Sequence, residues 1–325
     1  MNEIDRGKLE RSLDNIRGRV KDPQAGLFGP GSMVWRVNRE QVLGLGGGRA
    51  LLLQTAHPFV AHAVEQHSKF RTDPHGRGVR TFKALFAWIF GDLDSALVAA
   101  RRVHAVHSKI TGAMPHGVGA FPSGTPYAAN MDEALLWVHA TLWDTPILLY
   151  ERFVEKLTRQ EKEQYYEETK LFALLFGIPE SITPPTWGDF LEYCAKMHDS
   201  DVLTCDEVAR EIARYVLTPQ APSQAGLMKW MTVMTAGLLP ERIRYQYHFT
   251  WGRYEELVFE SSMKALSATW RRFPKEVREA PIYRRAQRRL GLLGEPNWLE
   301  RQVAKAMALP PENARPPRAG VAARA

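Results

Sequence analysis

The chain has 325 residues, a net charge of +7 and 45% hydrophobic residues, which provides material for a sizeable core and excludes a disordered polypeptide. Its two cysteines, Cys194 and Cys205, supply neither a disulfide framework nor a cysteine-based zinc or iron–sulfur spacing. The first residues lack the apolar stretch of a secretory signal, and no run of roughly 18 apolar residues could span a bilayer. We therefore predict a cytoplasmic protein and leave contact with a membrane surface open.

Helical periodicity recurs along the chain, whereas alternating strand patterns are scarce. We predict helices near residues 3–19, 49–67, 79–90, 92–112, 131–156, 159–176, 187–198, 205–216, 224–236, 240–247, 252–272, 275–290 and 296–307. Residues 20–35 and 113–130 are rich in Gly and Pro and are expected to form loops. No linker divides the chain, so the prediction is one all-α domain over residues 1–309, followed by a disordered basic tail over residues 310–325.

Four glycines at positions 44, 46, 47 and 48 precede Arg49. The pattern is not a dinucleotide-binding loop, because Arg49 stands at its sixth position and no strand–helix–strand unit surrounds it. It predicts a glycine turn that opens a helix. The turn either directs Arg49 to a ligand or lets two backbones pack closely.

The helix that follows, predicted over 49–67, contains Pro58, which is expected to kink it. His57, His62 and His67 are five residues apart and would spread around the helix, so these three alone do not predict a metal site.

Arg77, Arg80 and Thr81 fall on about one turn at the start of the next helix. Cations at a helix N-terminus favour an anion, such as a carboxylate, a propionate or a phosphate, or a bound oxygen species. Helix capping and surface salt bridges are the alternative. An aromatic run, Phe82, Phe86, Trp88 and Phe90, follows directly.

His104 and His107 lie one turn apart on the helix predicted over 92–112. Two ligands are too few for zinc, whereas heme needs only one axial histidine from the protein. His139, between Trp137 and Trp143 in a long apolar helix, is a second axial candidate. For each of these histidines the alternative is a structural role, with the ring hydrogen-bonded in the core.

The excess positive charge lies at the C-terminal end. From Pro240 onward the chain carries 17 Lys and Arg against 9 Asp and Glu. The charge peaks at Arg271-Arg272, Arg284-Arg285 and Arg288-Arg289. These helices would either meet anionic lipid or form a solvated basic face. We predict no nucleic-acid partner and allow peripheral membrane contact through them.

Taken together, these motifs resemble the latex-clearing-protein (rubber oxygenase) family, which includes the MpaB-type oxygenases. The resemblance covers roughly residues 30–255 and rests on Gly48-Arg49-Ala50 with Gln54, Ala56-His57-Pro58, His67-Ser68 with Phe70, Asp73-Pro74 with Gly76, Arg77, Arg80 and Thr81, His107 with Ile110 and Gly112, Trp137 to Leu142, and Leu238-Leu239-Pro240. It implies an all-α, globin-reminiscent fold that holds heme b and uses O2 to cleave carbon–carbon double bonds of an isoprenoid.

Carried over position by position, the resemblance makes His107 the proximal heme ligand and places His104 one turn before it. Arg77 and Thr81 match the Arg and Thr of the distal side. Where the rubber oxygenases have a lysine that can ligate the distal iron, this chain has Arg80, which stays protonated and is a poor iron ligand. Glu65 is the nearest candidate for the family's catalytic glutamate.

The leading hypothesis is a heme b-dependent oxygenase that acts with O2 on a small apolar, prenyl or lipid-like substrate. His107 would hold the iron and His104 would orient or shield it, with Arg80 and His139 also near the cofactor. Arg77 and Thr81 would polarise O2 in a dry pocket lined by the aromatic run, Trp137 and Trp143. The alternatives are a non-catalytic helical protein that binds lipid or a membrane surface, and a heme carrier or sensor.

Overall fold

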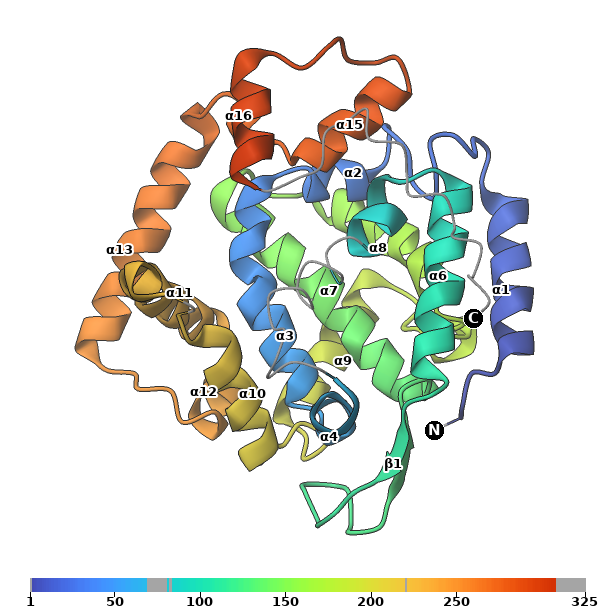
Figure 1. Cartoon of the computed structure of the whole chain (residues 1–325), viewed down its shortest axis with the longest axis vertical. Coiled ribbons are helices and arrows are strands. Elements are labelled where there is room, and N and C mark those ends of the chain that lie inside the picture. The colour runs from blue at the N-terminus through green and yellow to red at the C-terminus, as the bar shows by residue number, and fades with distance from the viewer. Residues whose placement is uncertain (1, 69–80, 82–83, 220, 308–325) are drawn as a thin grey trace, which may run out of the picture.

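Helices make up most of the structure, as the periodicity predicts (Figure 1). The computed structural model describes residues 2–68, 81, 84–219 and 221–307. Its α-helices are α1 Arg6–Arg19, α2 Met33–Asn38, α3 Gly47–Thr55, α4 Pro58–His67, α6 Leu93–His107, α7 Asp132–Phe153, α8 Arg159–Leu174, α9 Trp187–Asp199, α10 Glu207–Leu217, α11 Ala225–Leu238, α12 Glu241–Gln246, α13 Arg253–Thr269, α14 Lys275–Arg278, α15 Pro281–Arg289 and α16 Trp298–Ala306.

Short 3-10 helices, η1 Gln41–Gly46, η2 Glu180–Ile182, η3 Pro222–Gln224 and η4 Trp270–Arg272, join some of these elements, and residues 84–90 are also helical. The strands β1 Thr111–Ala113 and β2 Pro126–Ala128 pair antiparallel. The chain is thus one all-α domain with a single small hairpin among the described residues. The tail predicted to be disordered, residues 310–325, lies outside them.

The helix predicted over 49–67 is wrong in its continuity, because the chain breaks at His57-Pro58 into α3 and α4. His57 is extended, with φ −80° and ψ 118°, as expected for the residue before a proline. Its Nδ1 caps α4 by accepting a hydrogen bond from the Phe59 backbone N–H. Pro58 then occupies the first helical position, where no backbone donor is needed. The proline therefore starts a helix instead of kinking one.

The helix predicted over 92–112 extends too far. It ends at His107, and Gly112 lies in β1 opposite Tyr127. A Cβ at Gly112 would stand only 2.6 Å from the Tyr127 hydroxyl, so glycine is required there by the hairpin and not by a helix end. The predicted loop over 113–130 correspondingly contains β2.

The predicted loop over 20–35 is wrong at its end, because α2 begins at Met33. Ser32 caps this helix by accepting from the Trp35 N–H, and Glu168 of α8 accepts from the N–H groups of Met33 and Val34. Ser32 is a local capping signal, but the further capping of Val34 by Glu168, 134 positions away, cannot be read from the local sequence.

α3 lies beside α7 at the centre of the fold, with α11 on its other side (Figure 1). A Cβ at Gly48 would stand 2.2 Å from the Thr235 Oγ1 of α11, and one at Gly46 would stand 2.4 Å from the Thr145 Cγ2 of α7. Of the two interpretations of the glycine turn, close backbone packing is therefore the one that the structure supports.

Arg49 is buried between these helices, where its guanidinium bonds to groups of the protein itself. Its guanidinium donates to Asp144 Oδ2 at 2.6 Å, to Thr145 Oγ1 at 2.5 Å and to the Leu238 carbonyl at 2.9 Å. These bonds join α3 to α7 and to the end of α11.

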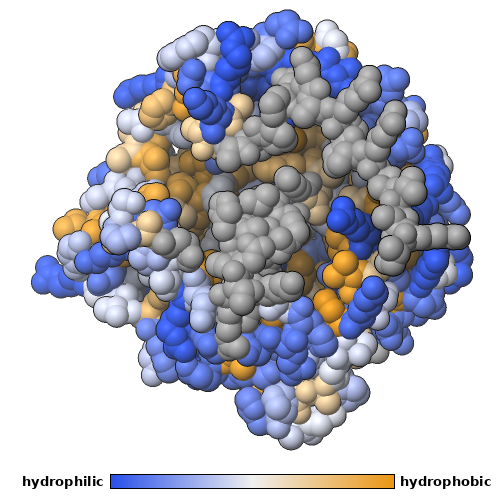
Figure 2. Space-filling view, in the orientation of Figure 1, coloured by the Kyte–Doolittle hydropathy of each residue, from blue (hydrophilic) through white to orange (hydrophobic). Residues whose placement is uncertain are grey.

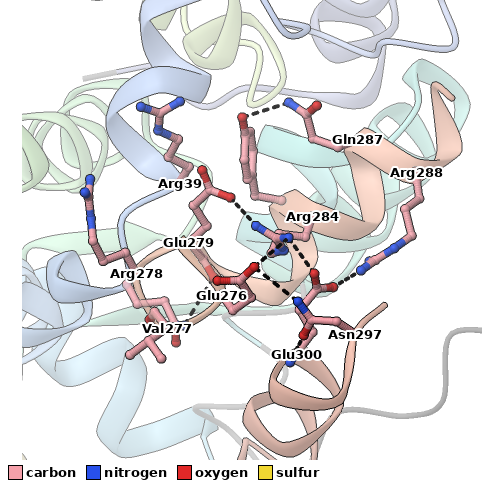
Figure 3. Close-up of polar contacts among 12 residues, drawn as sticks. Arg39, Glu276, Val277, Arg278, Glu279, Arg284, Gln287, Arg288, Asn297 and Glu300 are labelled. Atoms are coloured by element: carbon pink, nitrogen blue, oxygen red, sulfur yellow. Dashed lines mark hydrogen bonds and ion pairs between the residues drawn. The ribbon is translucent and has the colours of Figure 1, made fainter. Parts of the chain in front are cut away.

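The basic C-terminal helices are held by buried ion pairs (Figure 3). Arg284 of α15 is 7% exposed and donates to Glu279 at 2.7 Å and to Glu300 of α16 at 2.5 Å. Arg288 pairs with the other oxygen of Glu300. Two of the arginines at the charge peaks therefore hold α15 to α16.

We predict that Gly48→Ala destabilises the fold by about 1–3 kcal/mol, because the new methyl group must displace the side chain of Thr235. Thr235→Ala removes the contacting atoms, so the double variant should recover part of that loss in urea unfolding. Gly44→Ala is the control, since nothing lies within 4 Å of a Cβ at that position. Additive effects of the two substitutions would contradict the close-packing account.

Candidate functional site

The predicted distal residues are only partly described. Arg77 and Arg80 lie outside the described residues, and so does Phe82. Thr81 is described, and it is helical and exposed. The helical stretch over residues 84–90 includes Trp88 and Phe90, and both side chains are buried.

The predicted proximal histidines occupy the last turn of α6. His104 is buried, and its Nε2 donates to the Ile4 carbonyl at 2.8 Å. Its Nδ1 lies 3.4 Å from the Ser108 hydroxyl. Both ring nitrogens are thus engaged, so His104 fastens α6 to the N-terminal segment. Ile4 in turn donates its N–H to the Asn130 carbonyl, just ahead of α7.

His107 differs from His104 in having a ring nitrogen without a partner. Its Nδ1 is buried and has no hydrogen bond within the described part of the chain, although the residue as a whole is partly exposed. Burial, together with the neighbouring His104, lowers the pKa of His107 to about 4, and Asn130 partly offsets this. The imidazole is therefore neutral near pH 7, as a metal ligand must be.

His139 of α7 is enclosed by aromatic side chains. Its Nδ1 accepts from the Trp143 Nε1 at 3.1 Å, and the rings of Phe172 and Phe176 pack against it at 4.8 and 4.9 Å. Its buried Nε2 lacks a partner among the described residues, and burial lowers its pKa to about 3. A cavity of about 20 Å³ adjoins the ring, which is room for one water molecule.

The aromatic residues expected to line a pocket belong to the main hydrophobic core. Trp88 packs edge-on against Phe172 and Phe176, and the Trp137 indole donates to the Leu53 carbonyl at 2.8 Å. Trp143 is one of the residues that line the small cavity beside His139. A larger cleft of about 350 Å³ lies between α1 and the end of α8, and none of the predicted site residues lines it.

Sequence reasoning missed a second group of donors. His62 of α4, His116 of the β1–β2 connection and Asp206 at the start of α10 place one donor atom each within 4.8 Å of one another. The weak local signal was Asp206 followed by a helical pattern, which is typical of an N-cap. The histidines are remote in sequence, so only folding reveals the group. Glu65, one turn after His62, has a buried Oε2.

Surface features bear on the predicted membrane contact. Arg284 and Arg288 point into the ion-pair network (Figure 3), whereas Arg271, Arg272 and Arg289 are exposed. Apolar residues gather at the edge of the molecule over α11 and α13 (Figure 2), where Leu227, Tyr254 and Leu257 are each more than half exposed. Within the described residues, no helix has the length and apolarity needed to cross a bilayer. Membrane contact stays a prediction.

The buried histidines make the fold sensitive to acid. Burial lowers the pKa of His57 to about 4, like that of His107, so the unfolded state binds more protons from about pH 6.5 down to about pH 4. The free energy of unfolding must therefore fall as the pH drops through this window.

His57→Asn keeps a capping side chain for α4 but removes one of these titrations. We expect the slope of unfolding free energy against pH between about 6 and 4.5 to decrease by up to about 1.4 kcal/mol per pH unit, measured by urea unfolding. A slope equal to that of the unaltered protein would show that His57 is not held neutral.

Comparison with known proteins shows which family the chain belongs to. Residues 35–268 match the family model described as ER-bound oxygenase mpaB/B'/Rubber oxygenase, catalytic domain. Neither the curated proteins nor the solved structures that were compared gave a match. The matched region runs from α2 through nearly all of α13 and includes α4, α6 and α7 with their histidines. The chain belongs to the mpaB and rubber oxygenase catalytic-domain family.

Proposed function

We propose that this protein is a heme b-dependent oxygenase that uses O2 on a small apolar substrate of the prenyl or lipid-like kind. Membership of an oxygenase family supports the reaction class. The observation that carries the cofactor assignment is His107, a neutral imidazole with an unpartnered ring nitrogen at the end of α6.

Of the three histidines considered for the iron, His107 suits the role best. Both ring nitrogens of His104 are already in hydrogen bonds within the protein, one with the Ile4 carbonyl and one with the Ser108 hydroxyl. His139 is enclosed by Phe172 and Phe176, and the adjoining cavity admits no more than a water molecule. Of the three, only His107 is partly exposed, and its Nδ1 makes no hydrogen bond of ordinary geometry within the described residues, with the Asn130 side chain as the polar group that acts on its pKa.

His104 would act as a positioning residue for His107. Its hydrogen bond to Ile4, with the Ser108 and Asn130 contacts around it, fixes the last turn of α6. A ligand side chain on a fixed helical turn loses little conformational freedom when it binds. Heme b, once bound, would supply the iron centre at which O2 is activated.

Thr81 would lie on the distal side of the heme, where O2 and the substrate would bind. A threonine hydroxyl can donate one hydrogen bond and accept up to two, and the residue is exposed. Arg77, carried over from the family resemblance, would add a permanent cation. Oxidative cleavage of a carbon–carbon double bond places one atom of O2 on each carbon and yields two carbonyl groups, so no further reductant is required.

Replacing the proposed iron ligand gives a direct test. We predict that His107→Ala, expressed with a heme precursor, retains less than about a tenth of the heme content measured by pyridine hemochrome, because the side chain that would bind the iron is removed. Imidazole added to the variant should restore binding by occupying the vacated space. His248→Asn, which changes an exposed histidine at a positive φ of 57° that asparagine tolerates, is the matched control.

Heme content unchanged in His107→Ala would overturn the ligand assignment. Loss of heme in both variants would mean that the assay reports general damage and not ligation, and it would equally remove the support for His107.

The oxygenase reaction itself is tested by O2 uptake with prenylated small molecules and by detection of carbonyl products. Thr81→Val is nearly isosteric but removes the hydroxyl, so we expect unchanged heme content and turnover reduced roughly tenfold or more, equivalent to about 1.4 kcal/mol. Equal turnover in this variant would exclude a role for the hydroxyl. Heme binding without O2 uptake on any prenyl compound would instead favour a heme carrier or sensor.

A further inference from the structure

The geometry points to a second metal site, separate from the proposed heme. We propose that His62, His116 and Asp206 bind one divalent transition-metal ion, with Zn²⁺ as the preferred ion. The site would tie the β1–β2 connection to α4 and α10, and it would not depend on the oxygenase chemistry.

The three side chains converge on one carboxylate oxygen. The Nε2 of His62 lies 2.8 Å from Asp206 Oδ2, and the Nε2 of His116 lies 3.3 Å from the same atom. The two imidazole rings are 5.6 Å apart and nearly perpendicular. The donor atoms of all three residues are within 4.8 Å of one another, so a single ion could contact them together after small side-chain shifts.

Three separate segments supply these residues. His62 lies in the middle of α4, Asp206 is the N-cap of α10, and His116 projects from the connection between β1 and β2. α4 packs directly on α10, which holds His62 and Asp206 in place. The backbone around Asp206 is fixed as well, because its Oδ1 accepts from the Ala209 N–H.

Burial differs among the ligands in a way that suits a metal site with an open position. The side chains of His62 and Asp206 are 2% and 11% exposed, whereas that of His116 is 57% exposed. The buried pair would form the fixed base of the site and His116 would close it from the solvent side. The remaining coordination position would be left to water.

The chemistry of the donors selects the ion. Two imidazoles and one carboxylate are a common zinc set, which water completes to four ligands. Mg²⁺ and Ca²⁺ prefer oxygen donors and are disfavoured by this set. Zinc bonds of about 2.0–2.2 Å require donors slightly farther apart than the present 2.8 Å hydrogen bond, on the order of half an ångström.

An ordinary hydrogen-bonded pair explains only part of the arrangement. Asp206 Oδ1 accepts the capping bond from the Ala209 N–H, and Oδ2 is paired with His62. An exposed ion pair from His116 to the same oxygen would gain little, because exposed pairs contribute between zero and about 1 kcal/mol. A carboxylate oxygen can accept two hydrogen bonds, so the His116 contact alone does not call for an ion. The observation that points to a shared ion is that two imidazole nitrogens and one carboxylate oxygen lie within 4.8 Å of one another.

Isothermal titration of the untagged, chelator-treated full chain with Zn²⁺ tests the proposal. We expect one equivalent to bind, and Co²⁺ to give the visible absorption of a low-symmetry site with nitrogen and oxygen donors. His116→Ala alters an exposed side chain and should leave the fold intact, yet it should weaken Zn²⁺ binding at least about 100-fold by removing one of three ligands. Asp206→Asn should weaken binding as well, and His248→Asn should leave it unchanged.

Two results would overturn the site. One is the absence of stoichiometric Zn²⁺ binding by the unaltered protein. The other is equal binding by His116→Ala, which would place the ion elsewhere. His107→Ala separates this inference from the proposed function, because it should retain Zn²⁺ binding even if heme is lost.

Discussion

The buried guanidinium of Arg49 is the interaction on which the central packing depends. It donates to Asp144 and Thr145 on α7 and to the Leu238 carbonyl at the end of α11, and it is only 5% exposed. Close approach of α3 to these helices requires glycine at positions 46 and 48. Losing one partner of such a buried ion pair costs roughly 3–5 kcal/mol, so the three helices are held in one arrangement.

The bonds from Arg49 fix the position of α7, and the start of α7 in turn positions the N-terminal segment that contacts the candidate site. Asp132 at its start bonds the backbone N–H of Asn2, and the N-terminal segment then offers the Ile4 carbonyl to His104. That bond fixes the last turn of α6, on which His107 lies. The candidate iron ligand is thus positioned by a chain of contacts that begins in the core and passes through the N-terminal segment ahead of α1.

The sequence predicts the all-α class and most long helices because their apolar spacing is local information. The break at His57-Pro58 was missed because an apolar pattern on both sides hides it, although the residue before a proline is biased away from the helix. α2 was missed because it begins within a Gly- and Pro-rich stretch, where only Ser32 marks its start, and the rest of its capping comes from Glu168 of α8. The inward position of Arg284 was missed because Glu300 becomes its neighbour only when α16 folds back on α15.

For the candidate site, too, some features could be predicted from the sequence and others appear only in the folded chain. The spacing of His104 and His107 and the family resemblance are local or motif information, and the family match over residues 35–268 confirms the family. Which of the two histidines has an unpartnered nitrogen depends on Ile4, a hundred residues away, so sequence alone could not distinguish them. The group formed by His62, His116 and Asp206 is likewise assembled from three remote segments.

We propose that the protein is a heme b-dependent oxygenase, and its heme stoichiometry tests that assignment most directly. The unaltered chain, purified from cells supplied with a heme precursor, should contain one heme b per chain by pyridine hemochrome and one matching iron by elemental analysis. A colourless, iron-free protein that also fails to take up added hemin would contradict the account.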